Sequence, residues 1–209
     1  MHQRIIKKFD ECWVPDVNEE QNYSGALGHL ENHNFNLKYI GILSRFKYQK
    51  LNVKYNLLVV LSGPEPQRTL LENKLLIELK NYKGTILFVR GILSPETKIK
   101  ESSNFEIVNY LLSKDLETAI NESEIIIARS GYSTIMDLAV LGKKAFFIPT
   151  PGQFEQEYLA DTLQKKLIAP FATQNNFEVD NLKKLTKYSG FKKNKATFNL
   201  DFFNLFEGK

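Results

Sequence analysis

The stretch IIIARSGYSTIMDLAVLGKKAFFIPTP, residues Ile125 to Pro151, decides the fold. It opens as an apolar, β-branched run, which is typical of a strand covered on both faces of a sheet. The run stops at a Ser-Gly step beside Arg129, and a helical pattern follows at once, with Ser133 or Thr134 as the expected N-cap. A second apolar run then ends in a proline. The small residues are either a plain connector or an opening through which a ligand reaches the backbone.

The same alternation of strand and helix runs through most of the chain. Apolar runs such as LLVVLSG, from Leu57 to Gly63, alternate with stretches of helical spacing such as Gln67–Tyr82, and a further helix is expected with Ser113 as its N-cap. Such alternation produces right-handed βαβ units. We therefore predict an α/β fold over residues 51–209, with a Rossmann-like doubly wound parallel sheet. Further strands are expected in TILFVRG, FEIVNYL and KAFFIPT, and further helices in QFEQEYLADTLQKKL, VDNLKKLTKYS and FNLDFFNLF.

Composition excludes several classes of protein. The 209 residues are 43% hydrophobic, which suits one ordered domain with an appended piece. The net charge of +4 comes with scattered lysines, so we expect no nucleic-acid partner. Cys12 is the single cysteine, which excludes an internal disulfide and a thiolate metal cage and fits a cytoplasmic protein. No apolar run approaches the roughly 20 residues that span a bilayer.

Arginine is scarce, and its positions are informative. Of the 28 basic residues five are arginines, and four of these follow the end of an expected strand: Arg45, Arg68, Arg90 and Arg129. In an open parallel sheet, ligands bind beyond the carboxyl ends of the strands. Two explanations stay open. Any strand must end in something polar, or the forked guanidinium groups bind an anion such as a phosphate or diphosphate.

The stretch LSGPEPQRTLLENKL favours the anion site. A strand ends at Ser62-Gly63 and a helix begins near Gln67, so the free amide groups of a helix N-terminus are approached through a glycine. Arg68 in the first helical turn opposes the helix dipole, which makes more sense beside an anion. The stretch matches neither the Walker A loop of ATPases nor the GxGxxG dinucleotide pattern.

Acidic and amide side chains are also expected beyond the carboxyl ends of the strands. Asp137 lies about one turn into its helix, where a carboxylate either favours the helix dipole or accepts hydrogen bonds from a ribose diol. The polar residues that open the next helix form either a solvated face or a site for sugar hydroxyls. The candidate binding residues are Arg45, Ser62, Gly63, Arg68, Arg129, Ser130, Gly131, Ser133, Thr134, Asp137, Gln153, Gln156 and Glu157.

These motifs resemble the donor-binding domain of family-28-type glycosyltransferases. The resemblance rests on RSGYSTIMDLAVLGKKAFFIPTPGQFEQEYLA, YIGILSRF and LLVVLSGPEPQR, and it covers about residues 37–170. It implies the C-terminal half of a GT-B fold, which binds a nucleotide sugar without a metal ion or other cofactor.

The resemblance also implies roles for single residues. Arg45 and Ser62-Gly63 would face the diphosphate. Asp137 would hold the ribose, at a position where the family usually has glutamate. Gln156 and Glu157 would meet the sugar, where the family often shows two glutamines, so the glutamate is a departure that bears on sugar preference.

Residues 1–50 do not fit the strand–helix alternation. FDECWVPD resembles the last helix-to-strand piece of the family's N-terminal domain, so we expect residues 1–50 to be a remnant of that domain plus an interdomain linker. Residues 51–209 are then the nucleotide-sugar-binding domain of an incomplete, inactive chain. The catalytic residues stay unknown, because the family places the general base in the N-terminal half. None of His2, His29 and His33 is expected to be that base.

The implied function is that of an inverting, metal-independent glycosyltransferase of the cell envelope. It would transfer a hexose or N-acetylhexosamine from a UDP-sugar, with UDP-N-acetylglucosamine as the first choice. The acceptor is left open as a sugar or a lipid-linked glycan, and peripheral membrane contact is expected through the missing half. Two alternatives use the same domain: a nucleotide-sugar hydrolase or epimerase, and a non-catalytic donor-binding subunit that pairs with a separate acceptor-binding chain.

Overall fold

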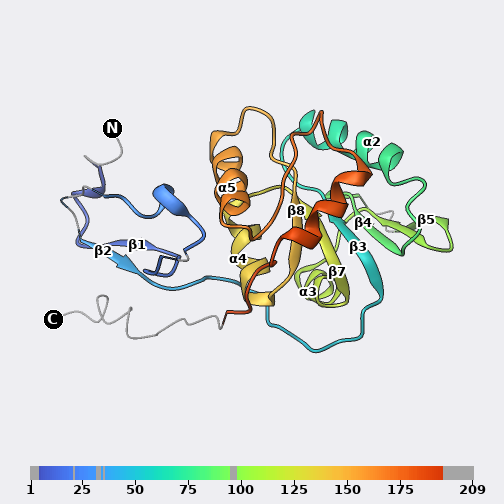
Figure 1. Cartoon of the computed structure of the whole chain (residues 1–209). Helices are drawn as coiled ribbons and strands as arrows, with labels where there is room; N and C mark the ends of the chain where they lie inside the picture. The colour runs from blue at the N-terminus through green and yellow to red at the C-terminus, as the bar shows by residue number, and fades with distance from the viewer. Residues whose placement is uncertain (1–4, 21, 32–33, 35, 95–97, 195–209) are drawn as a thin grey trace.

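The computed structural model of the protein describes residues 5–20, 22–31, 34, 36–94 and 98–194. A six-stranded sheet in the order β5-β6-β4-β3-β7-β8 forms its centre (Figure 1). The strands from β6 to β8 pair in parallel, and β5 is antiparallel to β6 at the edge. The predicted doubly wound parallel sheet is therefore confirmed. The strands are β3 (Tyr55–Val60), β4 (Ile86–Val89), β5 (Lys98–Ser102), β6 (Phe105–Val108), β7 (Ser123–Ala128) and β8 (Lys144–Phe147).

The strand order reverses between β3 and β7. From β3 the chain moves to β4 and β6 on one side, and from β7 it moves to β8 on the other. Leu57 of β3 is paired with Ile86 of β4 and with Ile125 of β7, so β3 lies at the middle of the sheet. The carboxyl ends of β3 and β7 therefore border the crevice in which doubly wound sheets bind their ligands.

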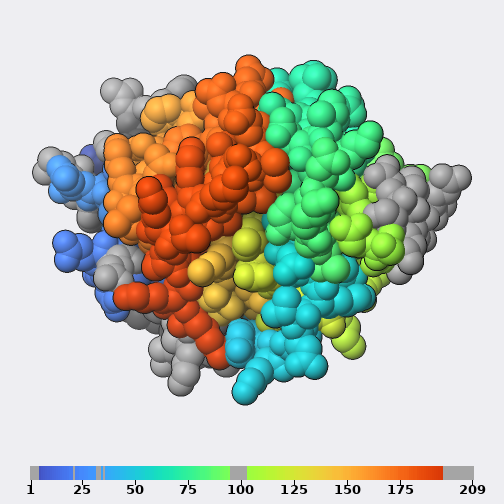
Figure 2. Space-filling model, turned by 45° about the vertical axis from the view of Figure 1, so that its right-hand side comes forward, coloured from blue at the N-terminus to red at the C-terminus, as the bar shows by residue number. Residues whose placement is uncertain are grey.

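Helices cover both faces of the sheet. On one face lie α3 (Ser113–Asn121), α4 (Tyr132–Leu141) and α5 (Phe154–Lys165); on the other lie α2 (Gln67–Glu78) and the 3-10 helix η2 (Val179–Lys187). Figure 2 shows the chain after α5, in orange and red, beside the green helix α2. Because the sheet is covered on both faces, all four residues of β4 are buried, which accounts for the continuous apolar runs. Of the helices described, none has the length and apolar character needed to cross a membrane.

Some elements differ from the predictions. α4 has Gly131 as its N-cap, so Ser133 and Thr134 lie inside the first turn. Ser113 is likewise the first residue of α3 and not its cap. VDNLKKLTKYS forms the 3-10 helix η2 in place of an α-helix. Strand β5 was not predicted, because an antiparallel edge strand needs no continuous apolar run. The FNLDFFNLF helix lies outside the described residues.

A second, smaller sheet lies next to α4 and α5 (Figure 1). Strand β1 (Cys12–Val14) pairs in parallel with β2 (Leu37–Tyr39), and a 3-10 turn η1 (Gly25–Leu27) lies between them in the chain. The Ala26 amide donates to the Tyr158 hydroxyl of α5 at 2.7 Å. Gly25 has a φ of +53°, and a Cβ there would lie 2.5 Å from the same hydroxyl, so this contact requires glycine.

Candidate functional site

A cleft of about 280 Å³ opens at the carboxyl ends of β3 and β7. Apolar strand residues such as Val60 and Ala128 form its floor. Its polar wall comes from the linker before β3, the β3–α2 loop and α4. Since the linker contributes, the site extends beyond residues 51–209. The sequence-predicted residues that line this cleft are Arg45, Ser62, Ser133, Thr134 and Asp137.

Arg129 does not reach a ligand site, contrary to the expectation of a guanidinium that grips an anion. Only 2% of the residue is exposed. Its Nη1 donates to the Ile148 and Pro149 carbonyls, and its Nη2 donates to the Gln67 carbonyl and to Gln174 Oε1, all within 3.0 Å. Burial lowers the pKa of this guanidinium to about 10, so it stays charged at neutral pH. Arg129 therefore ties the end of β7 to β8 and to the start of α2.

Arg68 and Arg90 are also held by protein groups. Both guanidiniums donate to the buried carboxylate of Glu72, which the sequence analysis did not single out. Arg68 Nε also donates to Glu65 Oε1 at 2.6 Å, and Arg90 Nη1 to Asn109 Oδ1 at 2.9 Å. The cation in the first turn of α2 is thus balanced by glutamates of its own segment, and an external anion is not needed to explain it.

Arg45 is the one of these four arginines that donates no hydrogen bond to the described part of the chain. It is exposed at the cleft, with its guanidinium 4.9 Å from the centroid of the Phe46 ring. A guanidinium in this position keeps all its donors for a ligand. The expected cluster of arginines is therefore reduced to a single free side chain.

Asp137 lies in the cleft, half-buried, as the sixth residue of α4. This position is beyond the first turn, so the helix dipole does not account for the carboxylate. Its Oδ1 accepts a hydrogen bond of 2.5 Å from the Ser44 hydroxyl, and no donor among the described residues contacts Oδ2. Burial raises the pKa of the Asp137 carboxyl, while the Ser44 hydrogen bond and the Arg45 charge lower it. One carboxylate oxygen therefore remains available to a ligand in the cleft.

The Ser130-Gly131 step combines both of its possible roles. Ser130 is fully buried, and its hydroxyl donates to the Gln156 carbonyl at 2.8 Å, so it is a connector that holds α5. Gly131 has an ordinary φ of −71°, and a Cβ there would meet only Thr134 Oγ1, at 3.9 Å. Neither backbone strain nor packing requires glycine at the N-cap of α4. Its lack of a side chain leaves the first amides of the helix open.

Gly63 lies in the turn that follows β3. Its φ of +105° is a conformation that other residues rarely adopt, so the turn after β3 requires glycine. A Cβ at Gly63 would be 3.8 Å from Thr150 Oγ1 at the end of β8. The turn after β3 therefore brings a backbone without a side chain close to the end of β8.

The polar residues at the start of α5 brace their own loop. The side-chain carbonyl of Gln156 accepts from the Thr150 amide at 2.9 Å, and its Nε2 donates to Gln153 Oε1 at 2.7 Å. Glu157 accepts from the Gly152 amide at 3.0 Å. The loop between β8 and α5 is thereby fixed at the same edge of the sheet, and none of these three side chains lines the cleft.

Fold and cleft together define the class of protein: a Rossmann-like α/β domain with a cleft at its topological switch point. The particular family follows from the sequence. The chain belongs to the family described as Glycosyltransferase family 28 C-terminal domain, whose sequence model matches residues 59–199. The resemblance predicted from the motifs is confirmed.

Two relatives of this chain carry one and the same enzyme name. A UDP-N-acetylglucosamine–N-acetylmuramyl-(pentapeptide) pyrophosphoryl-undecaprenol N-acetylglucosamine transferase of Haemophilus ducreyi is 27% identical over 146 residues, which are 66% of this chain and 40% of that protein. The enzyme of the same name from Methylobacterium sp. (strain 4-46) is 40% identical over 48 residues, 23% of this chain and 13% of its own. The chain spans less than half the length of these relatives.

A solved structure shows the same fold. The glycotransferase of kitacinnamycin superposes with a TM-score of 0.53 at 15% identity, over 72% of this chain and 40% of that one. At this identity the likeness concerns the fold alone.

Proposed function

We propose that this chain is the donor-binding part of an inverting, metal-independent glycosyltransferase that transfers a hexose or N-acetylhexosamine from a UDP-sugar. The observation that carries the proposal is the cleft in which Asp137, with one oxygen available, and the unpaired Arg45 lie together at the switch point. A nucleotide has the matching groups: a flat base for the apolar floor, a ribose diol for the carboxylate, and a diphosphate for the guanidinium.

The diphosphate has a second set of partners in this proposal. The open amides at the start of α4, beside Gly131, present the positive end of the helix dipole. As an acceptor hydroxyl attacks the sugar, negative charge grows on the departing UDP. Fixed amides and the Arg45 guanidinium stabilise that charge without reorganisation at the moment of reaction, which lowers the barrier. In this arrangement Ser62 and Gly63 lie along the diphosphate path.

The relatives' names bear on the substrates. They describe transfer of N-acetylglucosamine from its UDP derivative to a pyrophosphoryl-undecaprenol acceptor. We extend this to a UDP-N-acetylhexosamine donor and a lipid-linked acceptor for the present chain, with the reaction in the cytoplasm at the membrane surface. Gln156 and Glu157 are the residues that we assign to the sugar, once the loop that they brace contacts it.

Calorimetric titration of the purified chain tests the donor site. UDP is expected to bind about tenfold or more tightly than ADP or GDP, because the cleft of about 280 Å³ is small and a purine is a larger base than uracil. Arg45→Ala should weaken UDP binding by about tenfold or more, as expected for loss of a hydrogen bond to a charged group. Lys74→Ala, in the partly exposed Lys74–Glu78 pair of α2, is the matched control. Equal affinity for the three nucleotides would remove the proposal.

A further inference from the structure

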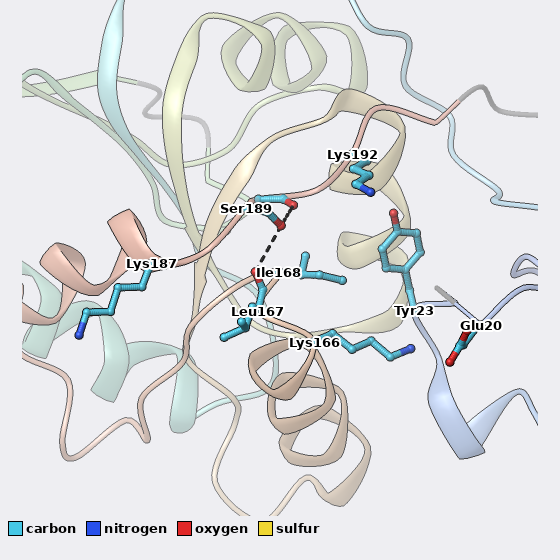
Figure 3. A pocket seen from close by; sticks show the side chains of 9 residues that line it. Glu20, Tyr23, Lys166, Leu167, Ile168, Lys187, Ser189 and Lys192 are labelled. Atoms are coloured by element: carbon cyan, nitrogen blue, oxygen red, sulfur yellow. Dashed lines mark hydrogen bonds between the residues drawn. The ribbon is translucent and has the colours of Figure 1, made fainter.

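A second cavity, of about 730 Å³, lies away from the cleft and shares no lining residue with it. It opens between Tyr23 of the N-terminal segment and the chain at the end of α5, around Leu167 and Ser189 (Figure 3). Its volume is within the range of pockets that hold small molecules, about 300–1,000 Å³. The family comparison assigns nothing to this place.

Lysine side chains dominate its chemistry. Lys166, Lys187 and Lys192 all line the cavity, and Glu20 at its lip is the one acidic residue among the described lining. Figure 3 shows Lys166 and Lys192 extending toward the Tyr23 side of the cavity, whereas Lys187 extends away from it. Two ammonium groups thus enter one concave space from separate segments of the chain.

These two lysines keep hydrogen-bond donors in reserve. Lys166 Nζ donates to the Asn22 carbonyl at 2.6 Å and to Asn22 Oδ1 at 3.3 Å, so one of its three donors is left for a ligand. Lys192 forms no ion pair with the described residues. The Tyr23 hydroxyl accepts from Asn194 Nδ2 at 2.8 Å, which leaves its own hydrogen free to donate into the cavity. Burial raises the pKa of Tyr23, so this hydroxyl keeps its hydrogen at neutral pH.

Three nearby lysines differ from Lys166 and Lys192 in having a charged or aromatic partner. Lys165 contacts Asp161 at 2.6 Å, Lys183 contacts Asp180 at 2.8 Å, and the Lys193 ammonium lies 3.5 Å from the centroid of the Tyr48 ring. Lys166 and Lys192 have no charged or aromatic partner among the described residues, and both enter the cavity (Figure 3). Bringing like charges together costs energy, which a bound anion offsets.

We propose that this cavity, the lysine pocket, binds a phosphoryl group through the ammonium groups of Lys166 and Lys192 and the hydroxyl of Tyr23. Three donors of this kind match the three or four acceptor oxygens of a phosphate. Leu167 and Ile168 supply apolar contact for the group that carries it. The ligand bridges the N-terminal segment and the donor-binding domain. The phosphoryl group belongs either to a free phosphate ester or to a phospholipid headgroup, since both present the same chemistry.

The experiment uses the full chain, and every titration is repeated in Arg45→Ala to show that the cleft does not contribute to the phosphate signal. In one arm, inorganic phosphate is titrated and binding is followed by nuclear magnetic resonance. In the other arm, vesicles of phosphatidylglycerol are compared with vesicles of phosphatidylcholine by co-sedimentation. We expect a Kd of about 1 mM or tighter for phosphate, or sedimentation only with the anionic vesicles.

Three variants and one control variant make the test specific. Lys166→Gln and Lys192→Gln should each weaken binding by about tenfold, and Glu20→Gln should strengthen it by removing a like charge near the anion. Lys183→Gln removes the same charge from an existing ion pair nearby and should leave binding within about twofold, since exposed pairs contribute little. UDP affinity should not change in any of them. Absence of binding in both arms, or binding that these lysine variants do not alter, overturns the proposal and leaves the UDP site untouched.

Discussion

Ser44 donates a hydrogen bond of 2.5 Å from its hydroxyl to Asp137 Oδ1, although 93 positions separate the two residues in the chain. This bond joins the linker ahead of β3 to the acid of the candidate donor site. The next residue, Arg45, is the free guanidinium of the same cleft. Two consecutive linker residues therefore serve the site: Ser44 holds the Asp137 carboxylate in place, and Arg45 supplies the positive charge that we assign to the diphosphate.

The first prediction concerns this hydrogen bond. Because it stabilises the ionised carboxylate, Ser44→Ala should raise the pKa of Asp137 further and weaken UDP binding at neutral pH by about fivefold to tenfold. Calorimetric titrations from pH 5 to pH 8 should show the loss of affinity moving to higher pH in the variant.

Ser44→Thr keeps the hydroxyl and should restore binding. Thr186→Ala removes an exposed hydroxyl elsewhere and serves as control. An unshifted pH profile in Ser44→Ala would mean that Ser44 does not act through Asp137.

The second prediction separates two glycines. Gly91 has a φ of +73°, and a Cβ there would lie 2.4 Å from the Leu61 carbonyl oxygen, so Gly91→Ala should destabilise the fold by at least about 2 kcal/mol. Gly131→Ala should change stability by no more than about 0.5 kcal/mol, since the position is open. It should nevertheless weaken UDP binding, because the added methyl group stands before the α4 amides. Urea unfolding and calorimetry of both variants measure the contrast. Unchanged UDP affinity in Gly131→Ala would count against the use of these amides.

The third prediction contrasts two arginines. Arg129→Met leaves four acceptors without their donor, three of them in buried contacts, so it should cost about 3 kcal/mol or more of unfolding free energy. Where it remains folded, its UDP affinity should stay close to that of the unmodified chain. Arg45→Met should do the opposite, with stability unchanged and UDP affinity reduced. Urea unfolding and UDP titration of the pair would contradict the assignment if Arg129→Met lost binding without losing stability.

The sheet and the place of the cleft could be predicted from the sequence. Strands buried on both faces read as unbroken apolar runs, and parallel strands present their carboxyl ends to one edge. Asp137 and Arg45 follow from that rule together with the family motifs. Strand β5 could not be found in this way, since it belongs to the edge and pairs antiparallel.

The arginine network was missed for a different reason. Arg68 has Glu65 three residues before it and Glu72 four residues after it, which is the spacing of ion pairs on a helix, so the signal was present. The burial of Arg129 left no such signal, because its partners are mainly backbone carbonyls brought together by the fold. No local sequence pattern predicts the contact of Ser44, because its partner Asp137 is 93 positions away in the chain, on α4.

The last prediction follows from the raised pKa of Asp137. Burial lets the folded state keep this proton to higher pH than the unfolded chain, in which the value is the ordinary 3.8. Stability therefore falls as the pH rises from 3.8 through the folded-state pKa, and at pH 7 the fold carries the cost of a half-buried charge. Asp137→Asn removes this cost, so it should be more resistant to urea than the unmodified chain at pH 7, and the difference should shrink toward pH 4. The same variant should lose UDP binding.

Asp161→Asn, which removes an exposed carboxylate paired with Lys165, should show little pH-dependent difference. A variant that is less stable at pH 7 would show that the carboxylate is a structural group, and the assignment of Asp137 to the ligand would lose its physical basis.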